Sequence, residues 1–206
     1  MRNITIFAPQ SNRIEMNNKK TITTVTLLIV LLLVIDQVTK LLVKCNMSLG
    51  ESIYIFDWFQ IHFIENPGAA FGMALGGVWG KIALTVFRIV ASGAIGWYIW
   101  RLIKQGAPKG VIFSLAVILA GALGNLIDSI FYGVIFDYAP LLQGKVVDML
   151  YFPLFTIQNM PSWLDWMCSA DGSWTFFNPV FNIADSYITC AVIYIFLFER
   201  KFFGHI

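Results

Sequence analysis

The chain has 206 residues, of which 58% are hydrophobic and 13% are charged, and its mean hydropathy is +0.72. This composition excludes an ordinary soluble domain and indicates a membrane protein with several spans. A net charge of +2 without a basic patch gives no reason to expect a nucleic-acid partner. The three cysteines and two histidines lack the spacing of a disulfide framework or a metal site, so we expect no metal.

Four apolar stretches are long enough to cross a bilayer as helices, which takes about 20 residues each. They cover residues 21–43, 80–103, 110–131 and 179–198. We therefore predict an all-α membrane protein, a four-transmembrane-helix bundle that forms a single domain over residues 21–203. Residues 1–20 make a polar N-terminal tail, predicted to be irregular as far as Glu15, and either Met1 or Met16 could be the true start.

The positions of basic residues predict the orientation in the membrane. Lysine and arginine lie before the first span, between the second and third spans, and after the fourth, and such residues mark the cytoplasmic side. Both termini are therefore predicted to be cytoplasmic, and segments 44–79 and 132–178 extracytoplasmic. Aromatic and β-branched residues over 51–66 predict a small β element on the outside. Segment 132–178 is predicted to be an enlarged loop and helix region.

Polar residues recur at helical spacing near the extracytoplasmic ends of three spans. Asp36 and Lys40 are four residues apart and can form an ion pair. Two further stripes consist of Gly121, Asn125 and Asp128, and of Asn182, Asp185, Ser186 and Thr189. In the fourth span, Asn178 is predicted to be the N-cap and Pro179 the first helical residue, which puts Asp185 about two turns inside the helix. Because ionisable groups are costly in lipid, we expect the stripes to meet in a functional site in the outer leaflet.

Five motifs follow one another along the chain: DQVTK (36–40), NPGAAF (66–71), GALGNLID (121–128), VVD (146–148) and FNIADS (181–186). In content and order they resemble the motifs of the type II signal peptidases, the lipoprotein signal peptidases of the bacterial inner membrane. The resemblance implies an intramembrane aspartic endopeptidase without a cofactor. Such an enzyme removes the signal peptide from diacylglyceryl-modified prolipoproteins by cutting just before the lipidated cysteine, at a site toward the extracytoplasmic face.

Carried over residue by residue, the resemblance makes Asp148 and Asp185 the catalytic pair. The residues that it implies as supporting or substrate-binding are Asp36, Lys40, Asn66, Gly68, Gly121, Asn125, Asp128, Asn182 and Ala184. Two carboxyl groups at short range resist joint ionisation, which suits amide hydrolysis because one must accept a proton while the other donates one. The expected partners are prolipoprotein substrates and membrane lipid, and the chain is expected to be a monomer.

The sequence departs from the family pattern at two places. Ser129 stands where an arginine commonly follows the third motif, so the contribution of that arginine must be supplied differently or not be needed. Segments 129–147 and 149–180 are longer than the family's compact spacing, and their fold is left open.

Two other classes of protein stay open as alternatives. A proton-coupled membrane transporter with a polar outer-leaflet site would also place Asp, Asn and Lys in a helical bundle. It would need a path to both faces, whereas the cytoplasmic halves of the spans are almost entirely apolar, with Arg88 as the exception in the second span. A structural protein whose polar stripes only join helices would leave Asp148, which lies outside the stripes, without a purpose.

Overall fold

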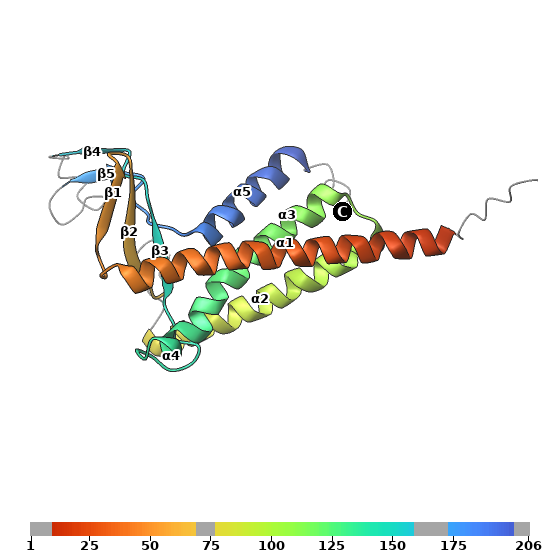
Figure 1. The fold of residues 1–206 in the computed structure, drawn as a ribbon, viewed down its shortest axis with the longest axis horizontal. Coiled ribbons are helices and arrows are strands. Elements are labelled where there is room, and N and C mark those ends of the chain that lie inside the picture. Colours follow the sequence, from red (N-terminus) through yellow and green to blue (C-terminus); the bar gives the residue numbers. More distant parts are fainter. Residues whose placement is uncertain (1–9, 69–76, 159–172, 200–206) are drawn as a thin grey trace, which may run out of the picture.

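The computed structural model describes residues 10–68, 77–158 and 173–199. Its main elements are the helices α1 (Gln10–Asn46), α2 (Gly77–Gln105), α3 (Lys109–Ile127) and α5 (Ile183–Phe198). Helix α3 is central, because it packs against each of the other three (Figure 1). The strands gather at the end of α1 that is opposite its N-terminal end (Figure 1).

Three helices in the described part of the chain are long and apolar enough to cross a membrane: Glu15–Asn46, Gly77–Gln105 and Lys109–Ile135. Helix α5 is also apolar but has only 16 residues, which corresponds to a length of about 24 Å. The start predicted for the fourth helix, at Pro179, is wrong. Helix α5 begins at Ile183 and its N-cap is Asn182, not Asn178.

The N-terminal tail is more ordered than the sequence predicted. Helix α1 begins at Gln10, so the predicted irregular segment is wrong from that residue on. One turn is held by an ion pair, 2.9 Å long, between Glu15 and Lys19. Pairs of this kind at four-residue spacing stabilise polar helical segments that have no core to pack against.

Helix α3 does not end where its regular hydrogen bonding ends. It continues through a π-helical turn, Asp128–Tyr132, into the short helix α4 (Gly133–Ile135). The returning chain supports this turn, because the amides of Leu142 and Gly144 donate to the carbonyls of Ile130 and Ser129 at 3.1 and 2.9 Å. Such wide turns in a helix are frequent at functional sites.

A three-stranded antiparallel sheet has the order β1-β2-β3, with β1 at Ser52–Phe56, β2 at Phe59–Asn66 and β3 at Val146–Tyr151. The hairpin predicted over 51–66 is confirmed. The prediction of a loop and helix region over 132–178 is wrong in part, since this segment also contributes β3, β4 (Phe155–Ile157) and β5 (Trp174–Phe176). The remaining part of that segment, 159–172, lies outside the described residues.

Two hydrophobic clusters enclose a polar layer. One joins α1, α2 and α3 and includes Val25, Leu102 and Val111. The other joins β2, β3 and the π-helical turn around Phe63 and Val147. The outer faces of the helices expose large apolar side chains, as is expected of a surface that faces lipid.

Candidate active site

Lys40 is the centre of a buried polar network contributed by α1 and α3. Its ammonium group lies 2.9 Å from a carboxylate oxygen of Asp36 and 2.9 Å from one of Asp128, and the side chains of all three residues are at most 1% exposed. It also donates to the amide oxygen of Asn125 at 2.9 Å. The predicted pair of Asp36 and Lys40 is confirmed, and Asp128 makes it a triad.

Asp36 also connects α1 to the first turn of α5. Its second carboxylate oxygen accepts a hydrogen bond from the backbone N–H of Ala184 at 3.0 Å. The first N–H groups of a helix have no partner within the helix, so a carboxylate stabilises this end. Gly124 permits the contact, because a Cβ there would collide with the Asp36 carboxylate.

Gly121 brings α3 and α5 together one turn away. A Cβ at Gly121 would lie 2.5 Å from the carbonyl oxygen of Ala184 and 2.8 Å from the side chain of Ile188. The two backbones therefore lie in close contact, which only a residue as small as glycine allows. Ala184 itself is fully buried, so a larger residue there would push the helices apart.

Two amide side chains connect the Lys40 network to the candidate catalytic carboxyls. Asn125 donates to a carboxylate oxygen of Asp185 at 2.8 Å. Asn182 donates to Asp148 at 2.7 Å and to the amide oxygen of Asn125 at 3.0 Å. Asn125 accepts and donates at the same time, so Lys40 fixes the orientation of the amide that faces Asp185.

Asp148 lies on β3, opposite Ile64 of β2, and is 2% exposed. Its second carboxylate oxygen accepts a hydrogen bond from Asn66 at 3.2 Å. Asn66 in turn accepts from the backbone N–H of Gly68 at 2.8 Å. The latter residue has a φ of +99°, and a Cβ there would collide with the side chain of Leu84, so this turn favours glycine.

The environment of Asp148 favours its protonated form. Burial raises the pKa of this carboxyl group, and repulsion from Asp185 raises it further, to about 7. The hydrogen bonds from Asn66 and Asn182 act in the opposite direction but are outweighed. A carboxyl group that keeps its proton near neutral pH can serve as a general acid.

Asp185 occupies the third position of α5, one turn nearer to the helix start than the sequence predicted. Together with Asn182 it forms a capping box: the Asp185 N–H donates to the Asn182 side chain at 3.0 Å, and the Asn182 N–H donates to the Asp185 carboxylate at 3.4 Å. The start of a helix carries a partial positive charge, which favours a carboxylate. Asn182 thus holds both candidate catalytic residues in place.

Three further side chains belong to this network although the sequence did not identify them as site residues. Gln37 donates to Asp128 at 3.0 Å and accepts from the hydroxyl of Tyr132 at 3.1 Å. Arg88 of α2 donates to the hydroxyl oxygen of Ser129 at 2.6 Å. A cation within an apolar span is itself a signal of function, and it could have identified Arg88.

The backbone of β3 joins the network directly. The N–H of Val147 donates to Asp128 at 3.2 Å, which ties the strand that carries Asp148 to the π-helical turn. The structure therefore brings together all of the residues that the sequence predicted for the site. Gly68 touches them through Asn66, whereas residues 69–71 of the same motif lie outside the described part of the chain.

A second charged cluster, separate from this network, lies beside the sheet. The carboxylate of Glu65 on β2 accepts hydrogen bonds from Lys44 and Lys145. Burial raises the pKa of Glu65, but these two lysines outweigh it and hold the pKa below its ordinary value. Lys44 also lies 4.5 Å from the ring centre of Phe136, so this cluster ties the end of α1 to the segment after α4.

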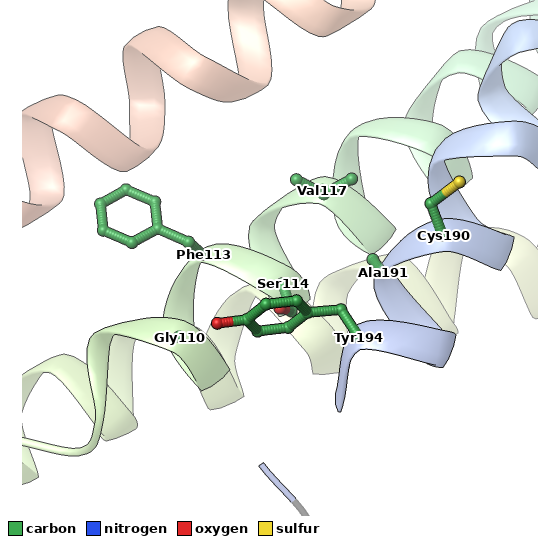
Figure 2. Close-up of a pocket in the computed structure, with 7 residues that line it drawn as sticks. All are labelled: Gly110, Phe113, Ser114, Val117, Cys190, Ala191 and Tyr194. Carbon is green, nitrogen blue, oxygen red and sulfur yellow. The ribbon is translucent and has the colours of Figure 1, made fainter. Parts of the chain in front are cut away.

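A cavity of about 430 Å³ between α3 and α5 is distinct from the polar network. Figure 2 shows Tyr194 and Ser114 on facing helices there, with Phe113 and Cys190 farther along. The described residues that line it are largely apolar and supply no pair of carboxyl groups, although the Glu199 carboxylate lies beside Gly110. Hydrolytic chemistry is therefore expected at the polar network and not in this cavity.

Comparison with known proteins identifies the family. Residues 28–200 match the family model described as signal peptidase (SPase) II. A lipoprotein signal peptidase of Porphyromonas gingivalis is 46% identical over 186 residues, which cover 82% of this chain and 79% of the relative. The lipoprotein signal peptidase of Amoebophilus asiaticus is 41% identical over 180 residues, covering 82% of this chain and 75% of the relative.

A solved structure agrees with these sequence matches. It is described as a bacterial membrane enzyme, is 28% identical, covers 85% of this chain and 92% of its own, and superposes with a TM-score of 0.58. The polar network thus lies in a chain whose sequence and fold both resemble known membrane enzymes. The chain belongs to the signal peptidase II family of aspartic peptidases.

Proposed function

We propose that this chain removes the signal peptide from diacylglyceryl-modified prolipoproteins, cutting just before the lipidated cysteine, with Asp148 and Asp185 as its catalytic residues. One observation carries the assignment: Asn182 donates to both carboxyls, from its side chain to Asp148 and from its backbone N–H to Asp185. The two carboxyls come from a strand and a helix far apart in the sequence. The other buried acids, Asp36 and Asp128, are ion-paired with Lys40 and have a structural role.

The two carboxyls are given different tasks by their environments. Asp148 is buried and its pKa of about 7 favours the protonated form, so it is the acid that polarises the scissile carbonyl. Asp185, at the start of α5, is the base that takes a proton from water. The resulting hydroxide attacks the carbonyl carbon, the C–N bond breaks, and the nitrogen leaves with a proton from the pair.

The arrangement of the helices suits a substrate that stays in lipid. The site lies where the helices meet the sheet, at the end of α1 remote from its N-terminus. We propose that this end faces the extracytoplasmic side of the bacterial inner membrane, that both termini are cytoplasmic, and that α5 is a fourth span. The acyl chains of the substrate then remain in the outer leaflet while its peptide reaches the site.

No observation favours the transporter alternative. A proton path would have to continue from the polar network toward the opposite ends of the helices. That region is filled by the buried cluster of Val25, Leu102 and Val111, whose side chains carry no polar atoms. We further propose that the enzyme acts as a monomer on prolipoprotein and lipid, without nucleic acid.

The test is cleavage of a diacylglyceryl-modified prolipoprotein peptide by the purified protein in detergent. The wild type should cut before the lipidated cysteine, and Asp148→Asn and Asp185→Asn should each abolish cleavage while remaining folded. Activity retained in either variant would contradict the catalytic assignment. A folded wild type that cuts nothing, but carries proton flux in vesicles, would favour the transporter.

A further inference from the structure

Arg88 is a charged residue in the middle of an apolar helix that faces the polar network. A guanidinium group within a membrane span is costly unless it is paired. In this structure Arg88 is half-buried and its Nη1 donates to the hydroxyl oxygen of Ser129 at 2.6 Å. No ion pair with a carboxylate is formed among the described residues, so the neutral hydroxyl holds the group in place.

Ser129 connects this guanidinium to the residue that orients Asp185. The Ser129 hydroxyl, which is fully buried, donates to the backbone carbonyl of Asn125 at 2.8 Å. The side chain of Asn125 donates to Asp185 at 2.8 Å. Burial disfavours the charge of Arg88, whereas the carboxyl groups of Asp185, Asp128 and Asp148 attract it.

The buried carboxyl groups of the site outnumber the one lysine that pairs with them. The titratable groups that face the candidate catalytic pair from the surrounding elements are Asp36 and Lys40 of α1, Lys81 and Arg88 of α2, and Asp128 of the π-helical turn. Lys40 is shared between two carboxylates. If the catalytic pair holds one proton, its other member is ionised and is a third carboxylate beside Asp36 and Asp128. Among the cations named above, those that remain for it are on α2.

Lys81 lies two turns before Arg88 on the same face of α2. Its ammonium nitrogen is buried and has no hydrogen-bond partner among the described residues. It lies beside Gly68, and hence on the side of the site that carries Asn66. Lys81 therefore adds positive charge at the edge, whereas Arg88 is tied to the centre through Ser129.

We infer that Arg88 is a positioning residue of the peptidase, whose guanidinium, seated on Ser129, is the counter-charge of the ionised member of the catalytic pair. This inference rests on the proposed function, because it needs one catalytic carboxylate to be ionised. Without the guanidinium, that carboxylate would face the carboxylates of Asp36 and Asp128, with the shared Lys40 and, at the edge, Lys81 as the cations left among the described residues. Water activation would then begin only at higher pH.

The test compares Arg88→Gln and Arg88→Lys with Arg101→Gln, a matched control that removes an exposed arginine from the same helix. Cleavage of the lipidated peptide is measured from pH 5 to pH 9 after a melting curve has verified the fold. We expect Arg88→Gln to lower kcat about 100-fold, with little change in KM, because a fixed charge acts on the reacting groups. The acid limb of its profile should move to higher pH by about one unit. Arg88→Lys should restore kcat to within about tenfold of the wild-type value. The control Arg101→Gln should have the kcat and the pH profile of the wild type.

Several outcomes would overturn the inference. An Arg88→Gln protein that cuts as fast as Arg101→Gln, with an unchanged acid limb, would refute it while leaving the peptidase function in place. If Arg88→Gln does not fold, Arg88→Lys decides: it retains the charge, so a folded lysine variant that is inactive also refutes the inference. If the wild type cuts nothing, the proposed function fails. The effect of Arg88 on the charge of the aspartates is then tested separately, by the infrared carboxyl bands of ¹³C-aspartate protein. Bands that titrate alike in wild type and Arg88→Gln would overturn the role of Arg88, and bands that differ would support it.

Discussion

Asp148→Asn should make the protein more stable at alkaline pH although it abolishes catalysis. The pKa of Asp148 rises from 3.8 to about 7 in the folded protein. Each unit corresponds to about 1.4 kcal/mol, so keeping this carboxyl ionised above pH 7 costs the folded state about 4 kcal/mol. The native state holds a proton that the unfolded state has already released, and wild-type stability therefore falls as the pH rises from about 4 to 7.

The asparagine also destabilises the folded state, because it cannot accept both of the hydrogen bonds that Asp148 accepts. The two carboxylate oxygens of Asp148 accept from Asn66 and from Asn182. An asparagine has one acceptor oxygen, so one of these donors would face another N–H group, which costs about 2 kcal/mol. The variant should therefore be about 2 kcal/mol more stable than the wild type above pH 7 and about 2 kcal/mol less stable below pH 4.

The free energy of unfolding can be measured in mixed micelles by denaturant titration at pH 5 and pH 8, followed by tryptophan fluorescence. The difference between variant and wild type should change by about 3 kcal/mol between these two pH values. Asp57→Asn, at an exposed acid of the β1–β2 turn, is the control and should show no such change. A difference that is the same at both pH values would refute the assignment of the proton to Asp148.

Three further predictions concern the polar network and the cluster beside the sheet. Lys40→Met leaves Asp36 and Asp128 buried without a cation, so the free energy of unfolding should fall by about 3–5 kcal/mol, and adding Asp128→Asn should recover part of the loss in the same titration. Asn182→Ala removes the cap of α5 and a donor to Asp148, so it should abolish cleavage and lower stability by about 1 kcal/mol or more; a wild-type melting curve would contradict this. Glu65→Gln should lower stability by about 1 kcal/mol at pH 7. The lowered pKa of Glu65 means that its contribution is present above the ordinary pKa and lost as pH falls through the folded value, so the two melting curves should converge in acid and not in base.

The sequence predicted features whose signals are local. The ion pair of Asp36 and Lys40 follows from four-residue spacing, and the hairpin over 51–66 follows from β-branched and aromatic residues. The start of α5 was misplaced because Asn178 and Pro179 imitate a helix start. The true signal was also local: Asn182 and Asp185 have the three-residue spacing of a capping box.

Other features depend on contacts between distant segments and have no local signal. The strand that carries Asp148 was not predicted, because its pairing with β2 is set by the tertiary fold. The contact between Arg88 and Ser129 joins two helices that each read as an ordinary span. Ser129 could be identified as the partner of Arg88 only once the helices were placed. Arg88 itself could be noticed in the sequence, because a cation is costly in lipid.

The position of α5 as the last helix among the described residues has a consequence for biogenesis. Translation delivers Lys40, Asn125 and Asp148 before Asn182, Ala184 and Asp185, and these last three make the contacts that complete the site. A nascent chain that ends before residue 182 contains the residues of the three-stranded sheet and of the three long helices, but only one of the two proposed catalytic carboxyls. On the proposed assignment, proteolytic competence arises only when α5 inserts, and a chain that stalls earlier should not cleave other proteins in the membrane.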